Sequence, residues 1–263
     1  MPLLQNLDEF KNVSPALQWI IFIVGCLIAL VAVISVCISI WLAIKYFRYN
    51  RKKNLRNLSG HDAARSVLDK NGLKHIKVST FGSLLFGNSY SHYFKKVRLR
   101  RLTHKKTSIT SLAIGVEKSA LAILDKQGDK DMKKRIALTP LVYFGPLAFI
   151  PLVAIGVIVD IILFNFTGVV TMIATGVGLL IYVVSFVLSI MTLKTEKKAQ
   201  AMACEIMKKE NLATDEEIDM MQELYKLYNI QYINDIVLEF LQMIMKILQF
   251  VANIQNSSKN SNN

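Results

Sequence analysis

Three stretches without a single charged residue limit what this chain can fold into more than any other feature of its sequence. They cover residues 12–44, 136–159 and 161–193, and so run for 33, 24 and 33 residues. A helix of about 20 apolar residues crosses a bilayer and satisfies its own backbone hydrogen bonds. The sequence therefore predicts an integral membrane protein with three transmembrane helices, an anchor at 17–47 and a hairpin at 136–193.

The first stretch is expected to remain in the protein as a permanent anchor. It is longer than the apolar core of a secretory signal, and basic residues follow it rather than precede it. The chain is 52% hydrophobic with a mean hydropathy of +0.36, which is unusual for a soluble domain. Its three cysteines, Cys26, Cys37 and Cys204, offer neither a disulfide framework nor a C-x-x-C metal pair.

Positive charge beside the apolar stretches predicts the topology. Residues 48–135 hold 22 Lys and Arg against 6 Asp and Glu, whereas the N-terminal segment 1–16 has no such excess. Because flanks rich in Lys and Arg stay in the cytoplasm, we expect the N-terminus outside and residues 48–135 and 194–252 inside. The cations expected at the membrane surface are Lys45, Arg48, Arg51, Lys52, Lys53, Arg56, Lys133, Lys134 and Arg135.

A basic domain can attract nucleic acid as well as lipid, and the pattern here favours lipid. Lys and Arg beside a span are attracted to anionic lipid headgroups. No aromatic pattern of an RNA-binding sheet and no zinc-finger spacing accompanies them. We therefore expect the lipid bilayer and its anionic headgroups as partners, with a protein partner or a protease as a further expectation and nucleic acid as the less favoured one.

Local patterns predict a mainly α fold with a small α+β cytoplasmic domain. A helix is expected over 59–70, where a Ser suits the N-cap and Asn-Gly follows the end. Two strands are expected at 76–80 and 93–100, with a loop over 81–91 between them. A second helix, capped by Thr or Ser and carrying one apolar stripe, is expected over 108–126.

The C-terminal part predicts amphipathic helices rather than a further span. Separate helical segments are expected at 199–211, from residue 215 onward, and at 232–252. The last of these has an apolar face and a polar stripe, so it suits a helix that lies on the membrane or packs on other helices. The tail 253–263 is polar and is predicted to be disordered.

Five segments follow the anchor in a characteristic order. They read LSGHDAARSVLDKNGL, SHYFKKVRL, SLAIGVEKSALAIL, RIALTPLVYFGPLAFIPL and TLKTEKKAQAMA. The set resembles the YugP-type family of bacterial membrane zinc metallopeptidases over about residues 55–250. The resemblance implies a helix with the motif H-E-x-x-H, whose two His hold zinc and whose Glu is the general base, and a further acidic ligand after the last span.

This chain departs from the family at the metal-binding positions. The two His fall on Gly115 and Ser119 and the Glu falls on Val116, so that only Glu196 matches, at the position of the acidic ligand. Lys198 stands where the family often has a second acidic residue. A catalytic zinc needs three protein ligands, so we expect no zinc, no other cofactor and no catalytic residue here.

The remaining residues do not rebuild the site elsewhere. No two of the four histidines are three or four residues apart, so no helix presents a His pair. Glu117 is expected to point away from the old site and stay solvated on the rim of its helix. Glu196 is expected among the neighbouring lysines of its own segment. His92, which with Tyr93 matches a His-Tyr pair of the family, is expected to bond locally.

These observations favour a catalytically silent relative of the zinc peptidases that acts as a membrane-held interaction or scaffold protein. Two alternatives stay open. An active metallopeptidase with substituted ligands would cleave substrates in a chelator-sensitive manner. A membrane tether for nucleic acid or ribosomes through residues 48–135 would bind with a log affinity that falls linearly with log salt.

Overall fold

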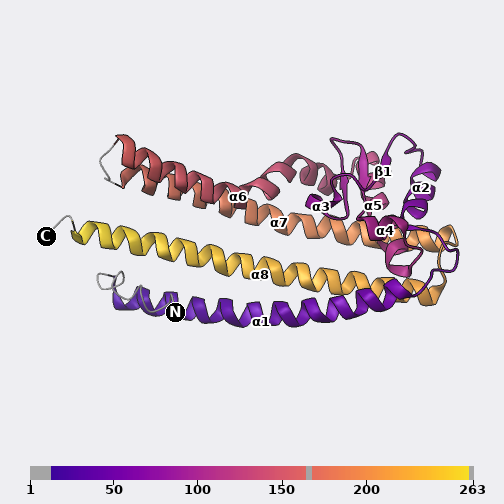
Figure 1. Ribbon diagram of the computed structural model, residues 1–263, viewed down its shortest axis with the longest axis horizontal. Coiled ribbons are helices and arrows are strands. Elements are labelled where there is room, and N and C mark those ends of the chain that lie inside the picture. The colour runs from indigo at the N-terminus through magenta and orange to yellow at the C-terminus, as the bar shows by residue number, and fades with distance from the viewer. Residues whose placement is uncertain (1–12, 164–167, 261–263) are drawn as a thin grey trace. The chain divides into compact units, whose positions relative to one another are not determined.

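The structure, a computed structural model, describes residues 13–163 and 168–260, without the side chains of 140–147 and 257–260. The described chain is mainly helical, as predicted, and it has one small sheet (Figure 1). Its four long helices are α1 (Pro15–Arg51), α6 (Lys130–Leu163), α7 (Val169–Lys209) and α8 (Asp215–Asn260). The short elements are α2 (Gly60–Lys70), β1 (Lys77–Ser79), α3 (Ser83–Phe86), β2 (Ser89–Ser91), β3 (Lys96–Arg98), α4 (Arg101–Lys105) and α5 (Ile109–Lys126).

The chain forms two compact units. Unit 1 consists of residues 1–36, 139–189 and 233–263, and unit 2 consists of residues 37–138 and 190–232. Each long helix contributes one segment to each unit. All of the short elements, and with them every position of the predicted peptidase site, belong to unit 2.

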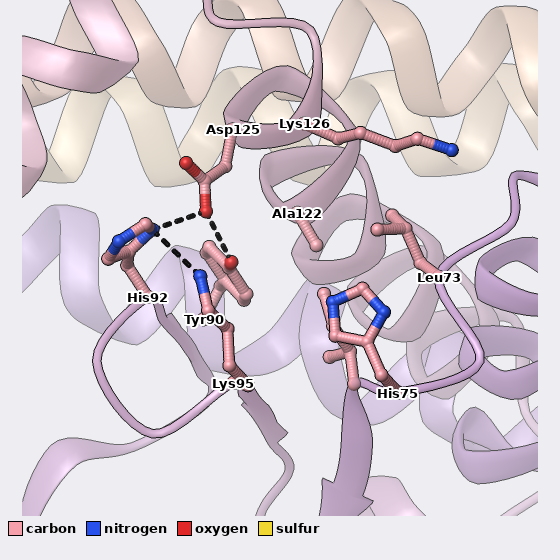
Figure 2. A pocket seen from close by; sticks show the side chains of 9 residues that line it. Leu73, His75, Tyr90, His92, Lys95, Ala122, Asp125 and Lys126 are labelled. Carbon is pink, nitrogen blue, oxygen red and sulfur yellow. Dashed lines mark hydrogen bonds and ion pairs between the residues drawn. The ribbon is translucent and has the colours of Figure 1, made fainter.

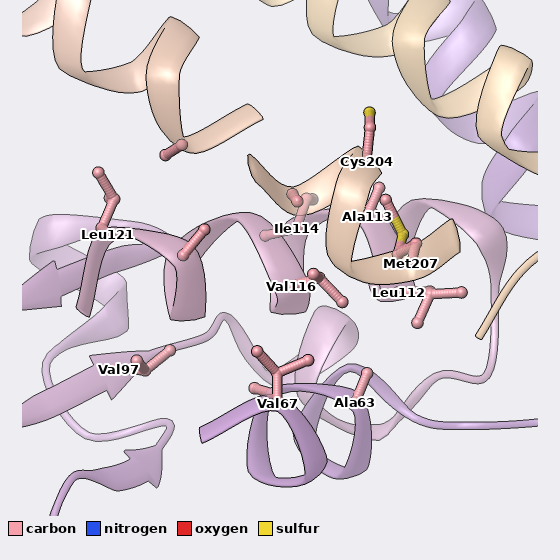
Figure 3. Packing of buried hydrophobic residues seen from close by; sticks show 14 of the residues in the cluster. Ala63, Val67, Val97, Leu112, Ala113, Ile114, Val116, Leu121, Cys204 and Met207 are labelled. Atoms are coloured by element: carbon pink, nitrogen blue, oxygen red, sulfur yellow. The ribbon is translucent and has the colours of Figure 1, made fainter. Parts of the chain in front are cut away.

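Unit 2 is built around α5. Fifteen of the 18 residues of this helix are buried, so it lacks the single apolar stripe predicted for it and is covered on all sides. Its side chains pack among residues of α2, β3 and α7 in one apolar core (Figure 3). The N-cap predictions are confirmed, because the side chains of Ser59 and Ser108 accept hydrogen bonds from Asp62 N and Ser111 N, each at 3.1 Å.

The sheet of unit 2 is smaller and more broken than predicted. Its order is β1-β3-β2, with β3 parallel to β1 and antiparallel to β2. The second predicted strand begins only at Lys96, because the chain turns through Lys95, whose φ is +45°. The predicted loop over 81–91 contains α3 and β2. Elements of three or four residues are too short to carry a periodic pattern, which is why the sequence did not indicate them.

Unit 1 buries few of its many apolar side chains. Its described residues form two small clusters, one of Val13, Leu17 and Ala252 and one of Tyr182, Phe186 and Met243. Large apolar side chains are exposed along its helices, on a scale that water-soluble proteins rarely tolerate.

Two described helices, α1 and α7, are long and apolar enough to cross a membrane, by length and composition. Only 6% of the most apolar stretch of α1 and 28% of that of α7 is buried. The third predicted span falls on α6, of which the shorter segment Ala148–Leu163 is apolar, and residues 140–147 lie outside the described side chains. The structure thus supports two candidate spans and not three, and the predicted turn of the hairpin at 165–168 lies mostly outside the described residues.

The C-terminal region is more continuous than predicted. The third apolar stretch and the predicted helix 199–211 form the single helix α7, and α8 runs unbroken for 46 residues. Residues 253–260 are therefore helical, and the prediction of disorder is wrong for them. No Gly or Pro occurs between Asp215 and Asn260, so nothing in the backbone ends the helix earlier.

Candidate functional site

The side of α5 that would carry the two metal-binding His packs directly on α2. A Cβ atom at Gly115 would lie 2.5 Å from the carbonyl oxygen of Gly60. A Cβ atom at Gly60 would in turn lie 2.3 Å from the carbonyl oxygen of Thr103. Backbone thus touches backbone at this crossing, and the first His position has no room for any side chain.

The other two motif positions are closed as well. Ser119 is fully buried, and its hydroxyl donates to the carbonyl oxygen of Gly115 at 2.9 Å and lies 3.3 Å from that of Ala64. Val116 is fully buried in the apolar core of unit 2 (Figure 3). The hydroxyl is therefore engaged by backbone, and the position of the general base is filled by aliphatic packing.

Glu196, the one matching ligand position, is bonded by two cations. Lys118 Nζ lies 3.0 Å from one of its carboxylate oxygens, and an Arg135 guanidinium nitrogen lies 2.6 Å from the other. Lys118 also lies 3.3 Å from the carboxylate of Glu117. We call these four residues, Glu117, Lys118, Arg135 and Glu196, the charge network, and its formal charges sum to zero.

Glu117 is buried, so the prediction of a solvated charge is wrong. Only 4% of it is exposed, and the side-chain amide of Gln200 donates to its carboxylate at 3.1 Å. Asn229 donates in turn to the Gln200 carbonyl oxygen at 2.8 Å. Burial raises the pKa of Glu117, although the adjacent Lys118 works against the shift. Burial also acts to lower the pKa of Lys118, but the carboxylates of Glu117 and Glu196 outweigh it and raise that pKa, so Lys118 stays charged.

Lys198 does not join the charge network. Its ammonium lies 2.9 Å from the carboxylate of Asp129 and 2.5 Å from that of Asp131. The same Asp129 carboxylate accepts hydrogen bonds from the backbone of Asp131 and Met132 at the start of α6. Lys198 therefore ties α7 to the first turn of α6, and the position where the family often carries a second acid serves a structural contact.

His92 lies in a separate pocket of about 260 Å³ (Figure 2). Its Nδ1 lies 2.6 Å from the Asp125 carboxylate, which also accepts a hydrogen bond from the hydroxyl of Tyr90 at 2.5 Å. The predicted local bond is present, because Lys95 Nζ lies 3.4 Å from His92 Nδ1, but the closer partner, Asp125, comes from the far end of α5. Burial, followed by the bond to Asp125, raises the pKa of Tyr90. None of the nine lining residues carries an aliphatic hydroxyl or a thiol, so the pocket holds no Ser, Thr or Cys nucleophile.

The residues predicted for the membrane surface divide into two groups. Seven of the nine are exposed, namely Arg48, Arg51, Lys52, Lys53, Arg56, Lys133 and Lys134. The other two are paired. Lys45 lies 2.6 Å from Glu223, and Arg135 belongs to the charge network.

A zinc ion does not fit this arrangement. Gly115 offers no donor and no space for one, the Ser119 hydroxyl is held by backbone, and Glu196 is neutralised by two cations. Within the described ranges, no three His, Cys, Asp or Glu side chains gather in a way that could hold a metal ion. A catalytic zinc needs three ligands and an open position, and these residues supply neither.

The comparison with protein families agrees with the order of segments along the chain. Residues 11–251 match the family model described as "Putative neutral zinc metallopeptidase". The chain belongs to this family. No curated protein and no solved structure matches it. The match spans both compact units of this member of the zinc metallopeptidase family.

Sequence reasoning missed the charge network. Glu117 was predicted to be solvated on the rim of its own helix, and Arg135 was predicted to lie at the membrane surface. The sequence contains a partial signal for this network, because Glu117 and Lys118 interrupt a mostly apolar helix. Charges that are buried in this way require partners. Which partners they find depends on α6 and α7, which lie far along the chain.

Proposed function

We propose that this chain is a membrane-anchored member of the zinc metallopeptidase family that lacks peptidase activity and serves as an interaction or scaffold protein. The observation that carries the proposal is the pairing of Glu196 with Lys118 and Arg135. A carboxylate that already binds two cations is a poor ligand for a third. The two positive side chains supply, inside the protein, the charge that a bound metal would otherwise bring to this carboxylate.

The closed crossing of α2 and α5 supports the same proposal independently. A zinc site requires side chains at both His positions of the motif, and one of these positions touches the backbone of Gly60. An open site for substrate and water would require α2 to move away from α5. The apolar core that joins the two helices opposes this movement.

The membrane anchor is the second part of the proposal. α1 and α7 are long and apolar enough to span a bilayer, and exposed Lys and Arg follow α1. Under the rule that such flanks stay inside, unit 2 faces the cytoplasm and the N-terminus lies outside. Held in this way, unit 2 would present its surface to anionic lipid and to a protein partner such as an active protease.

Metal content and proteolysis test the proposal together. Protein purified in mild detergent and supplied with zinc should contain far less than one zinc per chain by elemental analysis, and it should not cleave casein. The matched variant is G115H/V116E/S119H, which restores the motif. We expect it to gain no stoichiometric zinc, because the crossing with α2 leaves no room for the first His.

Near-stoichiometric zinc in the natural chain, lost in E196Q and accompanied by chelator-sensitive cleavage, would overturn the proposal in favour of an active peptidase with substituted ligands. Binding of RNA or ribosomes that weakens steeply with salt, in the absence of anionic vesicles, would favour the nucleic-acid tether instead.

A further inference from the structure

Exposed apolar side chains occur in the segments that connect the strands of the small sheet of unit 2. Four of them form what we call the apolar tip, and their exposed fractions are 79% for Phe81, 93% for Leu84, 83% for Leu85 and 70% for Phe94. Exposed Leu and Phe side chains at this density mark interaction sites in soluble proteins. Leu84 and Leu85 lie on α3, which Figure 1 labels, Phe81 precedes this helix, and Phe94 lies in the turn between β2 and β3.

The tip has a defined conformation. Gly82 and Gly87, with φ values of +80° and +62°, frame the single helical turn of α3. The buried Ser83 hydroxyl donates to the carbonyl oxygen of Thr80 at 2.6 Å, and Phe86 N donates to that of Gly82 at 3.1 Å. The hydrogen bonds of this turn therefore hold Leu84 and Leu85 in exposed positions.

Cations are interleaved with the aromatic rings of this region. The Arg98 guanidinium lies 5.0 Å from the ring centre of Phe86 and 5.4 Å from that of Phe94, and Lys96 Nζ lies 5.1 Å from the ring centre of Phe81. No Asp or Glu occurs between Lys70 and Val116, a stretch that contains nine Lys and Arg. An apolar and aromatic surface with Lys96 and Arg98 against its rings is complementary to an anionic bilayer, whose interface accepts aromatic and aliphatic groups and whose headgroups attract Lys and Arg.

We propose that the apolar tip inserts into the interface of the membrane that anchors the chain, with anionic phospholipid as its ligand. This inference rests on the proposed membrane anchor and adds a second, reversible contact to it. A protein partner is the competing occupant. The absence of acidic residues over the whole stretch favours lipid, because protein surfaces usually mix both signs of charge.

Site-specific fluorescence on the full chain tests the proposal. In a C26A/C37A/C204A background, single cysteines at Leu85, Glu216 and Ile34 carry a polarity-sensitive probe. The labelled proteins are reconstituted into vesicles of phosphatidylcholine alone or mixed with phosphatidylglycerol. Quenching by doxyl groups on the acyl chains reports insertion, and quenching by iodide reports exposure to water. Glu216 is an exposed acidic position of unit 2, and Ile34 lies within α1.

With phosphatidylglycerol present, we expect the probe at position 85 to shift its emission to the blue, lose iodide quenching and gain doxyl quenching. The probe at 216 should stay open to iodide. The shielding at 85 should weaken in phosphatidylcholine alone and in a K77Q/K95Q variant, which removes two exposed cations.

Iodide access at 85 in both vesicle types, with 34 shielded, would overturn the insertion of the tip and leave the anchor intact. Iodide access at both 34 and 85 would overturn the anchor itself and the insertion with it. Shielding from iodide at position 85 that increases with the number of chains per vesicle, without doxyl quenching, would show that a second copy of the chain covers the tip. This result would also overturn the proposal.

Discussion

Two sides of the same helix show opposite ways of closing a site. Towards α2, α5 presents Gly115 and Ser119, and the closure is steric, since backbone touches backbone at the crossing with Gly60. Towards α6 and α7, α5 presents Glu117 and Lys118, and the closure is electrostatic, since the buried charges cancel within the network. The steric contact requires that Gly115 has no side-chain atoms, whereas the charge network requires that all four of its charged side chains are present. Substitutions should therefore affect the two sides differently.

The largest effect is expected from removing the shared cation. Lys118→Met leaves Glu117 and Glu196 with less compensation in a buried place, and breaking a buried pair in this way costs about 3–5 kcal/mol in the free energy of unfolding. Denaturant titration in mild detergent measures it. Lys74→Met, at an exposed position, is the control and should change the free energy by less than about 0.5 kcal/mol. The double variant K118M/E196Q should recover part of the loss, and equal effects of K118M and K74M would refute the electrostatic account.

The next effect is expected on the steric side. Gly115→Ala adds a methyl group 2.5 Å from the Gly60 carbonyl oxygen, and such overpacking costs about 1–3 kcal/mol. Gly176→Ala is the matched control, because its added Cβ would meet only Phe250 at an ordinary 3.8 Å. The control should be neutral or stabilising by up to about 1 kcal/mol, since Ala favours a helix over Gly. A stable G115A protein would mean that α2 yields easily and that the crossing does not close the site.

A smaller effect is expected from the buried hydroxyl of the same side. Ser119→Ala removes the hydrogen bond to the Gly115 carbonyl oxygen without changing the volume much. One such bond contributes about 1 kcal/mol to the free energy of unfolding. Thermal unfolding of S119A next to G115A, in the same detergent, should place the two effects in that order. The reverse order would show that the polar contact, and not the close approach of the backbones, holds the crossing.

The smallest effect is expected from a pH change that acts on the α2 side. Burial lowers the pKa of His104, and its ring lies 4.6 Å from that of His61, which lowers it further. Because the folded pKa lies below the unfolded value of about 6.5, the unfolded state binds the proton first as the pH falls. Stability should therefore be complete above about pH 6.5 and decline below it. His104→Gln should flatten this decline, and an unchanged pH profile in that variant would assign the decline to other groups.

Residues of the core and the caps were largely predictable. Ser59 and Ser108 precede their helices with the side chain that a cap requires, and the apolar residues of α5 predicted a helix there, although not its burial on all sides. For the candidate site, the sequence predicted only which types of ligand residue are absent. The residue types at 115, 116 and 119 exclude zinc ligands, but they do not reveal that the first position touches another helix.

The errors arise where a residue's partner lies far away in the sequence or where an element is too short or too continuous for its pattern to be recognised. Glu117 was judged from its sequence neighbours, yet its partner Gln200 lies 83 positions away, and His92 bonds Asp125, 33 positions away, in addition to the neighbouring Lys95. The short elements α3 and β2 were missed because three or four residues carry no period. The C-terminal helix was divided where polar residues occur, although a helix without Gly or Pro can continue through them.

The sequence by itself determined the apolar helices, the excess of Lys and Arg over residues 48–135 and the family, because each of these depends on residue type and short-range order. Only the tertiary structure decided what surrounds positions 115 and 196. The distance from Gly115 to Gly60 and the pairing of Glu196 with Lys118 and Arg135 join segments from separate parts of the chain. Close packing and buried charge pairing act through space, and their partners are chosen when the helices meet.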